Sequence, residues 1–178
     1  NLLHGLLSVP PGAPNFAAVV CHPHPLYGGD MHNNIVSALV EAFAASGGAT
    51  LRFNFRGVGD STGHHDEGRG EIDDVKAATT YLAERCPSAN IIVSGYSFGA
   101  LVGLAAGTSD PRVAALVGVA LPIARRDAAF LESATQPKLL ISGDHDDFAP
   151  LASMQALFAR LSEPRTLTVI EGADHFFH

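Results

Sequence analysis

The sequence predicts an α/β fold in which a mostly parallel central sheet carries helices on both faces. Two observations predict it. Short apolar runs alternate with longer amphipathic stretches, and no internal repeat or low-complexity tract breaks this alternation. Strands that alternate with helices form parallel sheets, because each helix returns the chain to the edge where the last strand began. With 47% hydrophobic and 16% charged residues, we expect a single globular domain over residues 1–178.

The elements of the first half are predicted from their apolar periodicity. Residues 2–9 can supply at most one edge strand, and the apolar run at 17–21 predicts a buried strand. Residues 32–46 have apolar side chains at helical spacing and end at Gly47-Gly48, which predicts a helix followed by its stop signal. A second apolar run at 49–53 predicts the next strand.

The second half continues the alternation. A helix is predicted at 71–85, because apolar side chains recur on one of its faces. A run of small residues after Ser97 predicts a helix that can pack close to the sheet. The other expected elements are strands at 90–94, 113–119, 138–142 and 166–170, helices at 98–108 and 151–161, and a further short helix at 127–134.

Charge and cysteine content exclude several function classes. The formal net charge of −7 argues against nucleic acid or an acidic membrane surface as the main partner. No apolar run approaches the roughly 18 residues of a membrane-spanning helix. Cys21 and Cys86 are too few for a disulfide framework and lack CxxC spacing, so we expect a cytoplasmic protein.

Chemistry is expected in the turns that follow the strands, because ligands of parallel sheets bind beyond the carboxyl ends of the strands. One such turn is Gly95-Tyr-Ser-Phe-Gly99, a G-x-S-x-G pattern between a predicted strand and a predicted helix. The glycines allow a sharp turn, and the helix N-terminus favours developing negative charge. The pattern predicts Ser97 as a nucleophile, and a serine in a purely structural turn is the alternative.

Two later turns supply a candidate acid and a candidate base. Asp144, Asp146 and Asp147 crowd the turn after the strand at 138–142, and one of them is expected to orient a histidine. A solvated acidic loop is the alternative, and a metal site is disfavoured because local ligands alone cannot surround an ion. His175 follows the last strand, so serine, acid and histidine occur in the chain order expected of this fold.

Together these motifs resemble the α/β-hydrolases, and more narrowly a small uncapped bacterial subgroup related to the dienelactone-hydrolase-like proteins. The stretches that carry the resemblance are Cys21-His-Pro-His-Pro-Leu-Tyr-Gly-Gly29, Arg52-Phe-Asn-Phe-Arg-Gly-Val-Gly-Asp-Ser61, Gly95-Tyr-Ser-Phe-Gly99 and Gly172-Ala-Asp-His-Phe-Phe177. In such proteins the acid stands three residues after the glycine that ends its strand. The resemblance therefore implies Asp146, which follows Gly143 at that spacing, with Asp144 and Asp147 as alternatives.

The resemblance also implies an oxyanion hole. One donor is the backbone N–H of Phe98, directly after the nucleophile. The other comes from the loop after the strand at 17–21, where proline has no N–H to offer and Leu26 is the first available donor. The amide or hydroxyl of Tyr27 is the alternative. We expect His22 to shape this loop and the stretch His64-His65-Asp66 to be a solvated loop.

The expected function is hydrolysis of small or short-acyl esters by a serine hydrolase, with no cofactor or metal. The segment between the strands at 113–119 and 138–142 is too short for a cap domain, so the site is expected to be open and shallow. Because the sequence starts shortly before its first strand and stops soon after His175, we expect either an incomplete sequence or a sheet trimmed at both ends. The alternatives are a peptidase, thioesterase or acyltransferase with the same three residues, or a non-catalytic binding protein. In all of these, Arg125 and Arg126 are expected to be solvated, and contact with an anionic substrate is the alternative.

Overall fold

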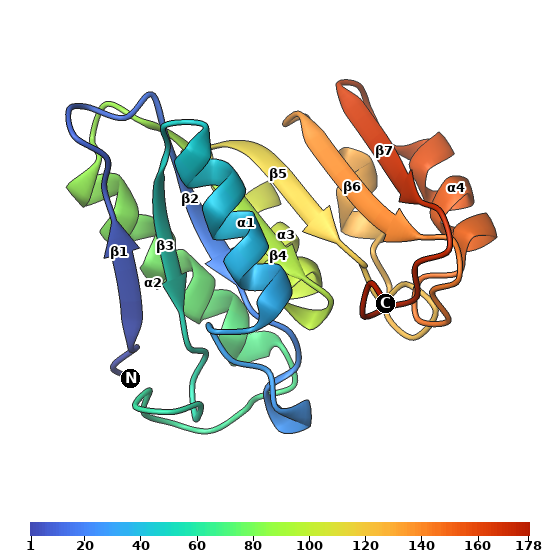
Figure 1. Ribbon diagram of the computed structural model, residues 1–178, viewed down its shortest axis with the longest axis horizontal. Helices are drawn as coiled ribbons and strands as arrows, with labels where there is room; N and C mark the ends of the chain where they lie inside the picture. The colour runs from blue at the N-terminus through green and yellow to red at the C-terminus, as the bar shows by residue number, and fades with distance from the viewer.

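A seven-stranded sheet runs through the computed structural model, which describes residues 1–178 (Figure 1). The strand order is β1-β3-β2-β4-β5-β6-β7, and only β1 is antiparallel, where it pairs with β3 at one edge. The other pairs are parallel, which confirms the predicted α/β fold. The strands are β1 Gly5–Ser8, β2 Phe16–Cys21, β3 Ala49–Phe53, β4 Asn90–Tyr96, β5 Val113–Val119, β6 Lys138–Gly143 and β7 Arg165–Ile170.

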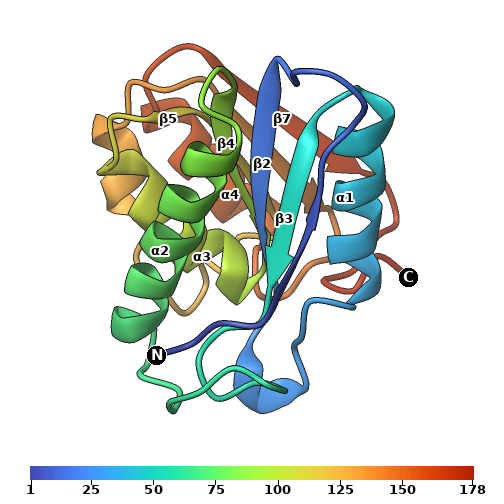
Figure 2. The same cartoon turned by 90° about the vertical axis from the view of Figure 1, so that its left-hand side faces the viewer.

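Helices lie on both faces of this sheet, as predicted. Helix α1 covers one face, and α2, α3 and α4 cover the other (Figure 2). No helix of the structure combines the length and apolarity needed to cross a bilayer. The helices are α1 Asn34–Ala45, α2 Arg69–Arg85, α3 Phe98–Thr108 and α4 Leu151–Arg160, with short 3₁₀ turns η1 Pro25–Tyr27 and η2 Ala129–Ser133.

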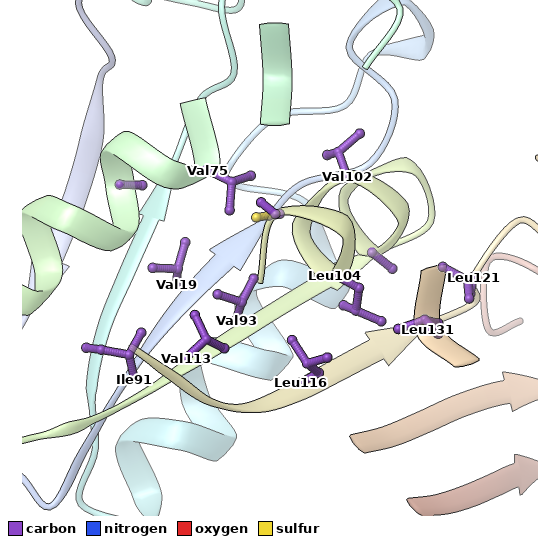
Figure 3. Close-up of a cluster of buried hydrophobic side chains, with 14 of the residues drawn as sticks. Val19, Val75, Ile91, Val93, Val102, Leu104, Val113, Leu116, Leu121 and Leu131 are labelled. Carbon is purple, nitrogen blue, oxygen red and sulfur yellow. The ribbon is translucent and has the colours of Figure 1, made fainter. Parts of the chain in front are cut away.

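Side chains on the two faces of β2 pack into two different hydrophobic clusters. Val19 and its alternate neighbours face the larger core under α2 and α3, whereas Val20 packs with Val36 of α1. Figure 3 shows the larger cluster, in which Leu104 of α3 and Leu116 of β5 are almost completely buried. Burial of each such leucine stabilises the fold by roughly 1.5–3 kcal/mol. This core fixes the strand ends that carry the site.

Helix α2 begins two residues earlier than its apolar periodicity predicts. Gly68 stands before the helix in a left-handed conformation, with φ of 94°. The carboxylate of Glu71 accepts hydrogen bonds from the N–H groups of Gly68 and Asp66, at 2.9 and 3.0 Å. This capping contact satisfies orphan donors of the first turn, so the helix starts at Arg69 although its apolar stripe starts later.

The start of the chain supplies one short edge strand, β1, as expected, and the segment between β5 and β6 contains no cap domain. Between β5 and β6 the chain forms loops and η2, which is shorter than the helix predicted at 127–134. At the β7 edge, Ile170 is 41% exposed, and Leu139 and Ile141 of β6 are half-buried. After β7 the chain runs to His178 without a further helix.

Candidate active site

Ser97 occupies a strained turn between β4 and α3. Its backbone has φ of 54° and ψ of −121°, in a region that residues other than glycine rarely adopt. The neighbouring glycines leave no room for side chains. A Cβ on Gly95 would lie 2.4 Å from the backbone of Gly99, and one on Gly99 would lie 2.3 Å from the carbonyl oxygen of His22. The pattern G-x-S-x-G therefore follows from close backbone approach, as predicted from the sequence.

We expect Gly99→Ala to lower the free energy of unfolding by about 2–3 kcal/mol, the cost of forcing extra volume into a packed site. The contact is with backbone, so it cannot be relieved by rotating a side chain. Gly103→Ala is the matched control in the same helix, because its Cβ would meet nothing nearer than the Cys21 sulfur, at 3.3 Å. Urea denaturation of both variants tests this expectation, and equal losses of stability would contradict it.

The structure brings Ser97, His175 and Asp146 together from three separate turns. The Nε2 atom of His175 lies 2.9 Å from Oγ of Ser97, and its Nδ1 atom lies 2.8 Å from Oδ2 of Asp146. His175 and Asp146 are buried, with 6% and 2% of their surfaces exposed. A carboxylate can only accept, so Nδ1 carries the proton that it donates to Asp146. Nε2 is then free to accept the proton of the serine hydroxyl.

The three aspartates of the loop after β6 make different contacts. Oδ1 of Asp146 accepts the N–H groups of Phe148 and Ala149, at 2.8 and 2.9 Å, which directs the other oxygen at the histidine. Asp144 instead accepts the N–H of Gly172 at 2.7 Å, and Asp147 is exposed. Only Asp146 of the three contacts His175.

Two aromatic side chains that sequence reasoning did not single out, Tyr96 and Phe148, hold His175 in position. The hydroxyl of Tyr96 donates to the carbonyl oxygen of His175 at 2.9 Å, and the ring of Phe148 lies 4.5 Å from the imidazole, centroid to centroid. Burial raises the pKa of Tyr96 to about 12, with a further contribution from the charge of Asp146. Tyr96 therefore remains a protonated donor at neutral pH.

The predicted oxyanion donors belong to two segments, the start of α3 and the 3₁₀ turn after β2. Phe98 is the first residue of α3, and no side chain of the N-cap residue accepts a hydrogen bond from the first turn of that helix. The amide of Leu26 donates to Nδ1 of His24 at 3.2 Å, and the amide of Tyr27 donates to the carbonyl oxygen of His24 at 3.1 Å. The side chain of Tyr27 lines the cavity above Ser97 but is 87% exposed.

His22 holds the loop after β2 in place by two hydrogen bonds. Burial lowers the pKa of His22 to about 4, so its ring is neutral at pH 7. It lies 2.7 Å from the carbonyl oxygen of Pro23 through Nδ1 and accepts the N–H of Phe55 through Nε2, at 3.0 Å. A neutral ring that donates at one nitrogen and accepts at the other fixes the loop, which agrees with the structural role expected of His22.

His65 lies in a buried position rather than in the solvated loop expected from the sequence. Its side chain is 7% exposed, and its Nδ1 atom lies 2.7 Å from a carboxylate oxygen of Glu71, which is fully buried. The ring packs against those of His24 and Phe98, with centroids 5.0 and 5.6 Å apart. The expectation was wrong for His65, because Glu71 in the first turn of α2 lies against its ring, whereas His64 of the same stretch is exposed as expected. No group of three or more His, Cys, Asp and Glu side chains is arranged to hold a metal ion.

An open cavity of about 670 Å³ lies over Ser97 and His175. Its wall includes residues from the loops after β2, β4, β5 and β6 and from the segment after β7, so all of them meet at the carboxyl edge of the sheet. Arg125 and Arg126 belong to this wall and are exposed to solvent, as expected from the sequence. Their position over the site depends on how the loop after β5 folds back, which no pattern in the sequence indicates.

Comparisons with known proteins agree with this arrangement. The family model of the serine aminopeptidases S33 matches residues 14–129, more than half of the chain. The uncharacterized protein RP471 of Rickettsia prowazekii is 35% identical over 176 residues, which cover 94% of this chain and 73% of that protein. An alpha-beta serine hydrolase homologue from Coxiella burnetii has a TM-score of 0.92 at 37% identity, over 99% of this chain and 85% of that one. The serine hydrolase without lid XC6422 from Xanthomonas campestris has a TM-score of 0.89 at 32% identity, over 99% and 81% of the two chains.

Proposed function

Because the chain belongs to the serine aminopeptidase S33 family and has the fold of the α/β serine hydrolases without a lid, we propose that it is a carboxylesterase acting on small or short-acyl esters. This membership, together with the likeness to a serine hydrolase without lid, confirms the resemblance to uncapped α/β-hydrolases. The observation that carries the proposal is the chain of contacts Ser97 Oγ, His175 Nε2, His175 Nδ1 and Asp146 Oδ2, at 2.9 and 2.8 Å. Such a chain activates a hydroxyl that is otherwise a weak nucleophile.

In this mechanism His175 acts first as base and then as acid. Oγ of Ser97 attacks the ester carbonyl while Nε2 of His175 takes its proton, and the imidazolium then gives that proton to the leaving alcohol. The acyl-enzyme is released when water attacks it, with His175 again taking a proton and returning it to Ser97. Asp146 holds the imidazole tautomer and stabilises the imidazolium. No cofactor or metal takes part in these steps.

The oxyanion that forms during both attacks needs donors on the side away from His175. We propose the amide of Phe98 as one donor and the amide of Leu26 as the other. The Leu26 amide makes a long hydrogen bond to His24, at 3.2 Å, and a developing negative charge competes well with an imidazole for this donor. The Tyr27 hydroxyl is the weaker alternative, because a side chain that is 87% exposed is stabilised by water instead.

Ester hydrolysis is favoured over removal of N-terminal amino acids by the charge of the cavity wall. An aminopeptidase must bind the ammonium group of its substrate, and an ammonium group taken out of water needs a carboxylate partner. None of the residues that line the cavity is Asp or Glu. Thioesterase or acyltransferase chemistry would use the same three residues, but a transferase must exclude water, and an open cavity does not favour this.

Covalent labelling gives the first test of the proposal. We expect a fluorophosphonate probe to form a stoichiometric adduct on Ser97 of the folded protein, because the probe reacts with serines activated by an adjacent base. Mass spectrometry of the tryptic peptide that contains Ser97 measures the adduct, and heat-denatured protein serves as the control. Absence of an adduct in folded protein would instead favour a non-catalytic binding protein.

A further inference from the structure

The cavity over Ser97 has a charge opposite to that of the whole chain. Arg125 and Arg126 lie in its wall, and no acidic residue does. The chain as a whole carries a formal net charge of −7, so an anion approaching at random meets a repulsive surface. A positively charged cavity in such a chain attracts anions to one place, and that place contains the nucleophile.

The two arginines differ in their partners. Nη2 of Arg126 lies 3.6 Å from a carboxylate oxygen of Glu67, which partly neutralises its charge. Six arginines of the structure form ion pairs, and Arg125 is not among them. Its guanidinium carbon lies 5.1 Å from the ring centroid of Phe148. Stacking on an aromatic ring leaves the N–H groups of a guanidinium available to a planar anion.

Arg125 is also connected to the reacting side of the site. The Phe148 ring on which it stacks lies 4.5 Å from the ring of His175, centroid to centroid, and the Phe148 amide donates to Asp146. His175 is the group that gives its proton to the leaving alcohol. These contacts place Arg125 on the His175 side of the cavity, where the alcohol part of an ester would take its proton.

We propose that Arg125 is a specificity-determining residue, and that the preferred substrates are esters whose alcohol part carries a carboxylate. This inference rests on the proposed function of the site. A guanidinium binds a carboxylate through two parallel N–H···O bonds, which gives direction as well as attraction. A neutral ester of the same shape cannot form these bonds, so the guanidinium stays hydrated and the ester gains no binding energy from it.

The test compares para-acetoxybenzoate with its neutral isostere para-acetoxybenzamide. We expect the wild-type protein to have about a tenfold or larger kcat/KM for the benzoate, the size of one charge-assisted hydrogen bond. Arg125→Gln should lower the ratio of the two kcat/KM values by a similar factor. Arg85→Gln is the matched control, because Arg85 also stacks on an aromatic ring, 4.9 Å from the centroid of Tyr81, and lies at the far end of α2. It should leave the ratio unchanged.

Other outcomes overturn the inference. Equal losses for both esters in Arg125→Gln would mean that Arg125 only supports Phe148. A preference that appears for monophenyl adipate over phenyl hexanoate, but not for the benzoate pair, would mean that the anion lies on the acyl side. Hydrolysis of both acetoxy esters without any preference would overturn the inference but leave the proposed function intact. Hydrolysis of neither, with no fluorophosphonate adduct, would overturn the proposed function itself.

Discussion

Ser97→Ala is expected to lower kcat for nitrophenyl acetate by on the order of 10³-fold or more, because it removes the atom that forms the acyl-enzyme. Residual turnover would come from binding and from the oxyanion donors, which the substitution does not touch. The change deletes one oxygen from a turn whose shape depends on Gly95 and Gly99. We therefore expect the thermal unfolding midpoint to stay close to that of the wild type.

Ser94→Ala is the matched control for this substitution. Ser94 lies on the same strand, β4, and its hydroxyl is completely buried without a hydrogen-bond partner. Its removal deletes the same atom close to the site and leaves the proposed chemistry intact, so kcat should be unchanged. Equal activity of Ser97→Ala and the wild type would exclude Ser97 as the nucleophile, and an equal loss in both variants would point to a general disturbance of β4.

The fold could be predicted from the sequence because its elements have strong local signals. The continuous apolar run of β2 supplies side chains to both hydrophobic clusters, because successive residues of a strand point to opposite faces. The apolar side chains of α2 recur with a helical period. The start of α2 was missed because it is set by the carboxylate of Glu71 and the backbone of Gly68. That contact is a property of one turn, and apolar periodicity does not report it.

The three residues of the proposed triad could be anticipated because parallel strands end at the same edge of the sheet. Each residue follows a different strand, so the topology alone brings them within reach. The choice of Asp146 came from resemblance, since three aspartates share one turn. In the structure the choice has a physical reason: the N–H groups of Phe148 and Ala149 hold one carboxylate oxygen and turn the other toward His175.

The walls of the cavity could not be predicted, and they decide the substrate. Phe148 and Tyr96 contact His175 from loops and strand ends whose side chains have no periodic signal. Arg125 reaches the site because the segment between β5 and β6 folds back over it, with the Ala124 amide donating to the carbonyl oxygen of Phe148 at 3.0 Å. Such contacts depend on loop geometry, so the sequence pattern favoured the solvated alternative for Arg125.

Asp146→Asn is expected to lower kcat by about 10⁴-fold at neutral pH, as such a substitution does in other serine triads. The reason lies in the hydrogen bonds of Asp146. Its Oδ1 accepts two backbone N–H groups, so the amide of asparagine must keep its oxygen there and turn its NH₂ group toward Nδ1 of His175. Nδ1 would then accept a hydrogen bond, Nε2 would carry the proton, and the imidazole could no longer take the proton of Ser97.

Two measurements separate this effect from a loss of structure. The ¹⁵N chemical shifts of His175 should report the exchange of tautomers in Asp146→Asn, while the fluorescence-detected unfolding curve stays near that of the wild type. Asp147→Asn is the matched control, because it removes the same charge from the same loop at an exposed position and should leave kcat unchanged. If Asp147→Asn or Asp144→Asn lost as much activity as Asp146→Asn, the acid would be a different aspartate. The contacts of Asp144 with Gly172 predict a smaller loss there, through the stability of the turn that carries His175.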